Sequence, residues 1–427
     1  MPILLRLALA ALLLSLTARA EAATYYVSNS GGSDANSCAT AQTIGTPKAT
    51  IKAGVGCAVA GDTVYVREGT GAYTTASDVI TSSAPGVASG SSFANAVTIA
   101  GYPGENVIIR TGEGVAQFLL NSGEQYVIVK DFVFDYVGDV SVQEAIYISG
   151  GAGHIRIQDV EVVNASQFGI VFASGSTGFN EVLTSQIHLT RDLLVTDITK
   201  GHGFYIICSD NLISGNLVWD NAGYGIQLYD SIGGDVSRNI VKNNRIYNNG
   251  TGHSSAYGIV TIRGSDNQIH DNLVYENQGG IWVGSTSSAA IVSNNTIANN
   301  VDEGLRYSTG PTAKNNIAYG NSTDIRDTCV ADTGGACSPS ATLSNNLTGA
   351  QITAATDFVD ATLHNFRLTI GSAAKDTGTA TCAWSPMDYD GVSRPQGSNC
   401  DVGAFEYQAV VPPASVPVLP RNIFRSR

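Results

Sequence analysis

A short phrase occurs seven times between Ala145 and Tyr307, and it limits the folds that this chain can adopt. Each copy is a small residue, usually Gly, followed by an apolar residue, a variable residue and a residue that is usually apolar. The copies are 24, 34, 22, 33, 22 and 24 residues apart and begin at Ala145, Gly169, Gly203, Gly225, Gly258, Gly280 and Gly304. A unit of about 22–24 residues, twice lengthened by roughly ten, predicts a solenoid with inserted loops.

Two positions of the phrase form columns of opposite character. The second position, here called the inner column, is apolar in every copy: Ile146, Ile170, Phe204, Ile226, Ile259, Ile281 and Leu305. The third position, the outer column, is mixed: Tyr147, Val171, Tyr205, Gln227, Val260, Trp282 and Arg306. Side chains alternate along a strand with period two, so the inner column faces a core and the outer column faces outward. Parallel strands joined by crossovers wind right-handed, which predicts an all-β, right-handed parallel β-helix.

Asparagine fills two further columns that follow the phrase. The first contains Asn216, Asn244, Asn272, Asn295 and Asn316, and the second, five residues later, contains Asn221, Asn249, Asn277, Asn300 and Asn321. We interpret both as structural ladders at coil corners, where Asn tolerates the left-handed conformation and its amide bonds to the next coil.

The first 22 residues are predicted to be a secretory signal peptide. Arg6 precedes an apolar run, 7–16, and small residues at Ala18, Ala20 and Ala22 offer cleavage sites. The run is too short to span a bilayer, and no later stretch is long and apolar enough to do so. We therefore expect a secreted protein, extracellular or periplasmic, that does not bind a membrane.

Charge and cysteine content support the same interpretation. The formal net charge of −13 argues against nucleic acid as a partner, because the phosphate backbone is itself anionic. Seven cysteines suit an oxidising compartment. Nearness in sequence predicts the pairs Cys38–Cys57, Cys329–Cys337 and Cys382–Cys400. Cys208 is left over inside the repeat and is interpreted as a buried core thiol.

The segments that flank the repeats resemble a known superfamily. Residues 24–28 read TYYVS, a short helix is expected at 51–55, and GDTVYV (61–66) precedes strands at 97–105 and 107–109. Near the other end, DYDGVSRP (388–395) leads to DVGAFEY (401–407). This order resembles secreted right-handed parallel β-helix proteins of the pectate-lyase-like superfamily. It implies an N-terminal helical cap with first coils at 23–120, coils at 121–350, a C-terminal cap at 351–408 and a disordered tail at 409–427.

The resemblance implies that the partner is a polysaccharide, which binds along a surface groove. It also implies a polysaccharide lyase that acts on uronic-acid polymers by β-elimination. Such chemistry needs a cation, Ca²⁺ or Arg, to neutralise the carboxylate, a base for the C5 proton and an acid for the leaving oxygen. The candidates are Arg263 or Arg306 for neutralisation, His202 or Lys200 for the base, and Tyr205 or Tyr229 for the acid. The chain lacks the clustered Asp ligands of calcium-dependent pectate lyases and the D-P-H motif of alginate epimerases.

Substrate contacts are expected from aromatic, amide and guanidinium groups, which offer flat faces and hydrogen bonds to sugars. The predicted binding residues are Tyr147, Tyr224, Gln227, Tyr229, Tyr257, Trp282 and Arg306. Inserted loops around 174–186 and 250–256 are expected to wall this site. We expect a monomer.

Three alternatives stay open at this point. A glycoside hydrolase would need paired carboxylates, for which Asp210, Asp230, Asp266 and Glu303 are candidates. A C5-epimerase on the same fold, or a non-catalytic carbohydrate-binding solenoid, would also fit the pattern. For His202, the alternative is a turn residue bonded to the backbone.

Overall fold

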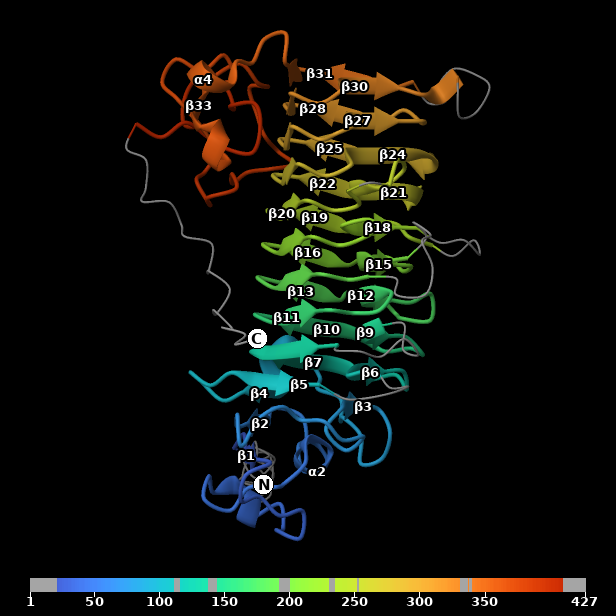
Figure 1. Ribbon diagram of the computed structural model, residues 1–427, viewed down its shortest axis with the longest axis vertical. Helices are drawn as coiled ribbons and strands as arrows, with labels where there is room; N and C mark the ends of the chain where they lie inside the picture. Colours follow the sequence, from blue (N-terminus) through green and yellow to red (C-terminus); the bar gives the residue numbers. More distant parts are fainter. Residues whose placement is uncertain are drawn as a thin grey trace, which may run out of the picture.

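The computed structural model describes residues 21–110, 116–136, 144–191, 200–229, 235–251, 253–330, 337 and 340–409. Within these ranges the chain forms three long parallel sheets, which run side by side along one elongated solenoid (Figure 1). The signal peptide falls largely outside the described residues, as do the tail from 410 onward and the candidate Asp230. The segment boundaries predicted from sequence stay a prediction.

Sheets A, B and C take one strand each from successive coils. Sheet A contains β1 (Thr24–Val27), β2 (Thr63–Val66), β4 (Val97–Gly101), β7 (Gln125–Lys130), β10 (Gly153–Gln158), β13 (Glu181–Leu183), β16 (Leu212–Ser214), β19 (Ile240–Lys242), β22 (Gln268–His270), β25 (Ile291–Ser293), β28 (Thr312–Lys314) and β31 (Thr342–Ser344).

Sheet B contains β5 (Val107–Ile109), β8 (Phe132–Asp135), β11 (Glu161–Val163), β14 (Gln186–His188), β17 (Leu217–Trp219), β20 (Arg245–Tyr247), β23 (Leu273–Tyr275), β26 (Thr296–Ala298), β29 (Ile317–Tyr319) and β32 (Leu347–Thr348). Sheet C contains β3 (Ile80–Thr81), β6 (Phe118–Leu120), β9 (Glu144–Ile148), β12 (Phe168–Phe172), β15 (His202–Ile206), β18 (Ile226–Leu228), β21 (Tyr257–Ser265), β24 (Gly279–Ser288), β27 (Glu303–Tyr307) and β30 (Thr323–Asp327). The repeat phrase of the sequence forms the strands of sheet C.

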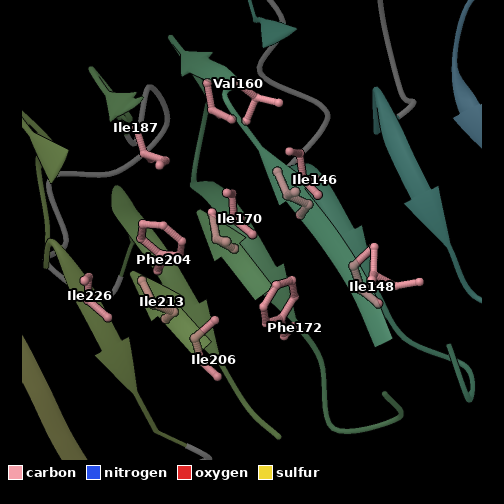
Figure 2. Packing of buried hydrophobic residues seen from close by; sticks show 14 of the residues in the cluster. Ile146, Ile148, Val160, Ile170, Phe172, Ile187, Phe204, Ile206, Ile213 and Ile226 are labelled. Atoms are coloured by element: carbon pink, nitrogen blue, oxygen red, sulfur yellow. The ribbon is translucent and has the colours of Figure 1, made fainter. Parts of the chain in front are cut away.

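The core is the stack of side chains inside the coils, and Figure 2 shows a part of it. All seven residues of the inner column are fully buried, and each lies in register with its neighbours on the adjacent coils. Ile187 of sheet B and Ile213 of sheet A are also fully buried and belong to the same cluster. The prediction of an inward apolar column is therefore confirmed, as is the fold class.

The asparagine ladders are confirmed, but not the backbone conformation predicted for them. Asn244, for example, donates from Nδ2 to Asn272 Oδ1 at 3.0 Å, and its own Oδ1 accepts from Asn216 Nδ2 at 2.9 Å. The left-handed residue is the one before, as in Asn243 (φ 54°). That residue makes the corner, which frees the next side chain to turn inward. A third ladder, missed in the sequence, runs through Asn180, Asn211, Asn239 and Asn267.

Short elements close the first coil and flank the last. The helix α2 (Ile51–Val55) has the predicted bounds and buries Ile51 and Val55 against the core. The 3₁₀ turns are η1 (Thr40–Gln42), η2 (Phe93–Asn95) and η3 (Ala361–Leu363). The C-terminal segment 351–408, which contains α4 (Ala354–Asp357), β33 (Phe358–Asp360) and β34 (Asn365–Leu368), lies beside the upper coils (Figure 1).

The cysteine pairing predicted from sequence is confirmed. Disulfides join Cys38 to Cys57, Cys329 to Cys337 and Cys382 to Cys400, and Cys208 is a buried free thiol. Burial raises the pKa of the Cys208 thiol to about 11, so it stays protonated and fits the core role predicted for it.

One of the two predicted loop insertions was placed only partly correctly. Residues 174–186 include most of the connection between β12 and β13, which has eight residues against four between β9 and β10, but they also contain β13, the sheet A strand of that coil. Most of the extra residues follow β14 and precede β15, where 192–199 are outside the described ranges. The other insertion, around 250–256, does lie in a connection, between β20 and β21.

Candidate functional site

The outer column of the repeat forms one continuous strip on the outer face of sheet C. Its residues pair in register from strand to strand, in the order Tyr147, Val171, Tyr205, Gln227, Val260, Trp282 and Arg306. Val171, Gln227 and Val260 are nevertheless buried, because neighbouring side chains on the same face cover them. A second outward column, three residues before the outer column in the sequence, supplies that cover and contains Glu144, Phe168, His202, Tyr224 and Tyr257.

His202 lies inside a cluster of aromatic rings on this face. Its ring centroid is 4.8 Å from that of Tyr224, 5.4 Å from that of Phe168 and 6.1 Å from that of Tyr205. The side chain is only 1% exposed, and Nδ1 accepts a hydrogen bond of 3.1 Å from the backbone N–H of Tyr224. A neutral imidazole whose Nδ1 is an acceptor carries its proton on Nε2. This geometry does not support a base role and instead matches the backbone-bonded alternative.

The second part of the face gathers around Tyr257. Its hydroxyl donates to Glu303 Oε2 at 2.7 Å and accepts from Arg306 Nη1 at 3.3 Å. The guanidinium of Arg306 lies over the ring of Trp282, with its central carbon 4.7 Å from the ring centroid. Glu303 also pairs with Arg326 of β30. Two arginines, a carboxylate and two aromatic rings therefore form one connected network on strands β21, β24, β27 and β30.

Electrostatics follow from this packing. Burial raises the pKa of Tyr257, so its phenol remains protonated at neutral pH. Burial also acts to raise the pKa of Glu303, but the hydrogen bond from Tyr257 and the pairing with Arg326 outweigh it, so that pKa lies below its ordinary value. Glu303 is thus an anion held by its neighbours, and it compensates part of the positive charge of Arg306 and Arg326.

Arg263 and Tyr229 form a pair next to this network. The central carbon of the Arg263 guanidinium lies 5.8 Å from the ring centroid of Tyr229, and both side chains are half-buried. A register shift between Thr261 and Arg263 changes the direction in which the side chains of this part of β21 point. Burial raises the pKa of Tyr224, while the charge of Arg306 lowers it and Tyr229 raises it. Tyr224 therefore lies within electrostatic reach of both groups.

Two predicted residues lie apart from this gathering. Tyr147, on β9, is two strands from Tyr205 in sheet C. Lys200 is half-buried and directly follows the segment 192–199, which is outside the described residues. The structure thus brings together Tyr224, Tyr229, Tyr257, Arg263, Trp282 and Arg306. His202 contacts this group through Tyr224, and Tyr205 in turn contacts His202.

Sequence reasoning missed Glu144 as a site residue. Glu144 begins β9 on the outer face, in register with Phe168, and burial raises its pKa to about 7. Its neighbour Tyr147 has a raised pKa, first through burial and then through the charge of Glu144. The sequence could have indicated Glu144 by its position, because it directly precedes a copy of the repeat phrase, as His202 and Tyr257 do.

The carboxylates considered for a hydrolase do not gather. Asp210 precedes β16 of sheet A and pairs with Arg238 at 2.7 Å, and Asp266 precedes β22 of the same sheet, whereas Glu303 lies on sheet C. Among the described residues, one close group of three metal-ligand side chains is Asp327 with Cys329 and Cys337. Those two sulfurs are joined in a disulfide, and calcium prefers clusters of oxygen ligands. That group does not fit a calcium ion.

Comparisons with known proteins agree with the architecture. A curated relative, the uncharacterized protein YwoF of Bacillus subtilis (strain 168), is 28% identical over 278 residues, which are 58% of this chain and 57% of that protein. The chain therefore matches little more than half of that relative's length. No helix in the described part of the chain is both long and apolar enough to cross a membrane.

Among solved structures, pectate lyase Pel9A superposes with a TM-score of 0.62 at 17% identity, over 91% of this chain and 97% of that one. An alginate lyase from Paenibacillus sp. str. FPU-7 gives a TM-score of 0.41 at 18% identity, over 70% of this chain and 97% of the other. The sequence profile described as "Right handed beta helix region" matches residues 118–297 and 191–357, which together span more than half of the chain. The chain belongs to this family of right-handed β-helix proteins.

Proposed function

We propose that this protein binds a uronate-containing polysaccharide along the outer face of sheet C and cleaves it by β-elimination. The observation that supports this most is the Arg263–Tyr229 pair, a guanidinium beside a phenol, on a face rich in further aromatic and guanidinium groups. The shared fold of a pectate lyase adds support for the substrate class. The half-buried aromatic rings and arginines of this face suit sugar rings and their carboxylates.

In the proposed reaction, Arg263 pairs with the uronate carboxylate and so acidifies the C5 proton. Lys200 is the candidate base that takes up the C5 proton, and the phenol of Tyr229, beside that guanidinium, is the candidate acid that donates a proton to the departing oxygen. Loss of the C5 proton forms the C4–C5 double bond, the C4–O bond breaks, and the departing oxygen takes up a proton. Trp282 and Arg306 form the neighbouring surface on which the next sugar units would lie, and the buried Tyr257 holds Arg306 through its hydroxyl.

Assay of ultraviolet absorbance from unsaturated ends, on pectate, alginate and glycosaminoglycans, tests this proposal. Arg263→Gln and Tyr229→Phe should each reduce product formation by about 100-fold or more, because each removes a group that acts in the transition state. Lys200→Met decides whether the base is Lys200. Arg67→Gln is the matched control, since Arg67 also lies over a tyrosine ring, that of Tyr102, but at the N-terminal end of the solenoid.

Absence of product from every polymer would overturn the proposed β-elimination. If the protein were retained on a uronate polymer without forming product, it would be a carbohydrate-binding protein instead. Product formation that is unchanged in Arg263→Gln and Tyr229→Phe would place the chemistry elsewhere. Either result is clear, because Arg67→Gln reports any general effect of losing a half-buried arginine that lies over a tyrosine ring.

Export is part of the same proposal. Three disulfides favour an oxidising compartment, and a polysaccharide substrate would be met outside the cytoplasm. Expression of the full chain in a bacterial host, followed by fractionation and N-terminal sequencing of the mature protein, should find it exported and cleaved near Ala22. A full-length product retained in the cytoplasm would contradict export.

A further inference from the structure

A large cleft lies on another side of the solenoid, between sheet B and the C-terminal segment. That segment packs on the outer face of β23, β26 and β29, with Phe358, Phe366 and Phe405 buried against it. Its edge stops short of the lower strands and leaves a cleft of about 870 Å³. Sheet B supplies Gln186, Leu217 and Arg245, and the segment supplies Val359, Leu363 and Arg367. Ligand sites commonly occupy clefts of this size between two packed units.

The cleft continues along the solenoid instead of ending under the segment. A second hollow of about 340 Å³, lined by Val133 and Glu161, shares Thr184 and Gln186 with the first. Successive strands of sheet B place Val133, Glu161, Gln186, Leu217, Arg245 and Leu273 in one column. With about 4.8 Å between neighbouring strands, this column is about 24 Å long. The shape fits an extended chain molecule better than a compact one.

The lining combines apolar surface with unused hydrogen-bonding capacity. Leu363 is 75% exposed and Val359 is 44% exposed, so both contribute apolar surface to the wall of the cleft. Gln186 lies where the two hollows meet, and its Oε1 is a buried atom that has no hydrogen-bond partner among the described residues, so a small turn of the side chain would offer it to a ligand. A sugar chain offers both complements, because its C–H faces cover aliphatic side chains and its hydroxyls donate to amide oxygens.

The charges around the cleft argue for an uncharged ligand. Asp131, Asp159 and Glu161 line the lower hollow, where no Lys or Arg is among the lining residues. In the upper cleft, Arg367 is neutralised by two hydrogen bonds to Asp390, of 2.6 and 2.7 Å. His364 is paired with Glu276 at 2.8 Å. Arg245 donates from Nε to the hydroxyl of Tyr275 at 2.6 Å, a neutral partner that does not compensate the arginine's charge. A polyanion would therefore meet three carboxylates in the lower hollow and, among the described lining residues of the upper cleft, one arginine without a carboxylate partner.

We propose that this cleft is a second polysaccharide-binding site, which holds an uncharged glycan strand without cleaving it. The site lies on sheet B and is independent of the face of sheet C to which the cleavage reaction is assigned. A protein with both sites would attach to a neutral polymer while it acts on an acidic one in the same material.

Binding to neutral glycans tests the site directly. The probes are xylohexaose, cellohexaose and mannohexaose, measured by titration calorimetry on the full-length protein, with a galacturonate oligomer as the acidic comparison. Leu363→Asp should weaken binding of at least one neutral hexasaccharide by about tenfold or more. Ile370→Asp is the matched control, because Ile370 is 77% exposed in the same C-terminal segment but does not line the cleft.

A blocking experiment separates the cleft from any effect on folding. Leu363→Cys labelled with a bulky maleimide should abolish neutral-glycan binding, whereas labelled Ile370→Cys should bind normally. The native free thiol, Cys208, is buried and should not react. The proposal is overturned if no neutral hexasaccharide binds, if only the acidic oligomer binds, or if the blocked cleft binds as well as the control. Arg263→Gln should leave neutral-glycan binding unchanged, so the two proposals can fail separately.

Discussion

At the residue scale, buried asparagines tie each coil to the next through their side chains. Asn244 donates to the carbonyl of Ile213 at 2.9 Å as well as to Asn272, and it accepts from the backbone and the side chain of Asn216. Neighbouring ladder residues repeat the pattern, so the amides on successive coils form a continuous chain. A break at one position therefore leaves buried donors and acceptors on two coils without partners.

Asn244→Ala should lower the free energy of unfolding by about 2–3 kcal/mol, because the partners of the lost amide remain buried and unsatisfied. Urea denaturation followed by circular dichroism measures this change. Asn121→Ala is the control, since Asn121 is exposed and outside the ladders. Equal effects of the two substitutions would show that the ladder contributes little to stability.

The titration of Glu144 predicts how binding to sheet C depends on pH. Burial raises its pKa in the folded protein to about 7, so Glu144 is mostly neutral at lower pH and becomes an anion as the pH rises through that value. A uronate polymer on the same face would then be repelled. Two unit charges about 6 Å apart in water repel by about 0.7 kcal/mol, which is a roughly threefold loss of affinity.

Binding of an unreactive uronate oligomer should therefore weaken about threefold between about pH 5.5 and pH 8.5. Glu144→Gln should remove most of this dependence, because glutamine does not titrate. Titration calorimetry at both pH values provides the measurement. A pH dependence that is the same in wild type and Glu144→Gln would assign it to another group.

At the scale of elements, the strands of sheet C begin where two coils approach each other closely. A Cβ added at Gly225 would lie 2.6 Å from the carbonyl oxygen of Gly258 and 2.9 Å from Cγ2 of Ile246. Gly203, one coil earlier, is crowded in the same way by the Gly225 carbonyl. The recurring glycine of the repeat is thus explained mainly by this close approach, and less by a special backbone angle.

Gly225→Ala should lower the free energy of unfolding by about 1–3 kcal/mol, since the backbone of the next coil must shift to make room. Gly45→Ala serves as the control, because a Cβ there would meet nothing within 4 Å. Denaturation midpoints of the two variants provide the comparison. A Gly225→Ala protein as stable as Gly45→Ala would mean that the coils can separate at no cost.

At the scale of the whole molecule, each coil contacts mainly its neighbours, so damage at one end should remain local. The C-terminal segment is held by a hydrophobic cluster and by a buried network in which Arg394 joins Asp271 at 3.2 Å and Glu406 at 2.9 Å. The N-terminal end depends on a different disulfide and on α2. The two ends are therefore separate units of stability on one solenoid.

Replacing Cys382 and Cys400 together by Ser should destabilise the C-terminal segment by about 3 kcal/mol, as expected for a disulfide that closes a short loop. Limited proteolysis should then cut within 351–408 and leave the coils protected. The matching double replacement of Cys38 and Cys57 should expose the N-terminal end instead. Cleavage throughout the coils in either variant would contradict local unfolding.

The sequence alone predicted the period, the inner column, the asparagine ladders, the bounds of α2 and the disulfide pairs. These features depend on relations that a linear pattern retains: alternation along a strand, stacking of one coil on the next, and cysteines close in the chain. The left-handed position was missed by one residue because the same pattern fits either corner residue. The strand β13 was mistaken for part of a loop because it is short and its inward residue, Val182, has a half-buried residue on either side.

Only the tertiary structure decided which groups are reachable and what surrounds them. His202 has the position of an exposed base in the repeat, yet Phe168 and Tyr224, from the coils on either side, bury it. The cleft beside sheet B forms because the C-terminal segment, about 150 residues away along the chain, folds back against that sheet. Burial, pKa and cavities depend on side chains brought together from distant parts of the chain, and a repeat pattern records only the position of each residue within its own coil.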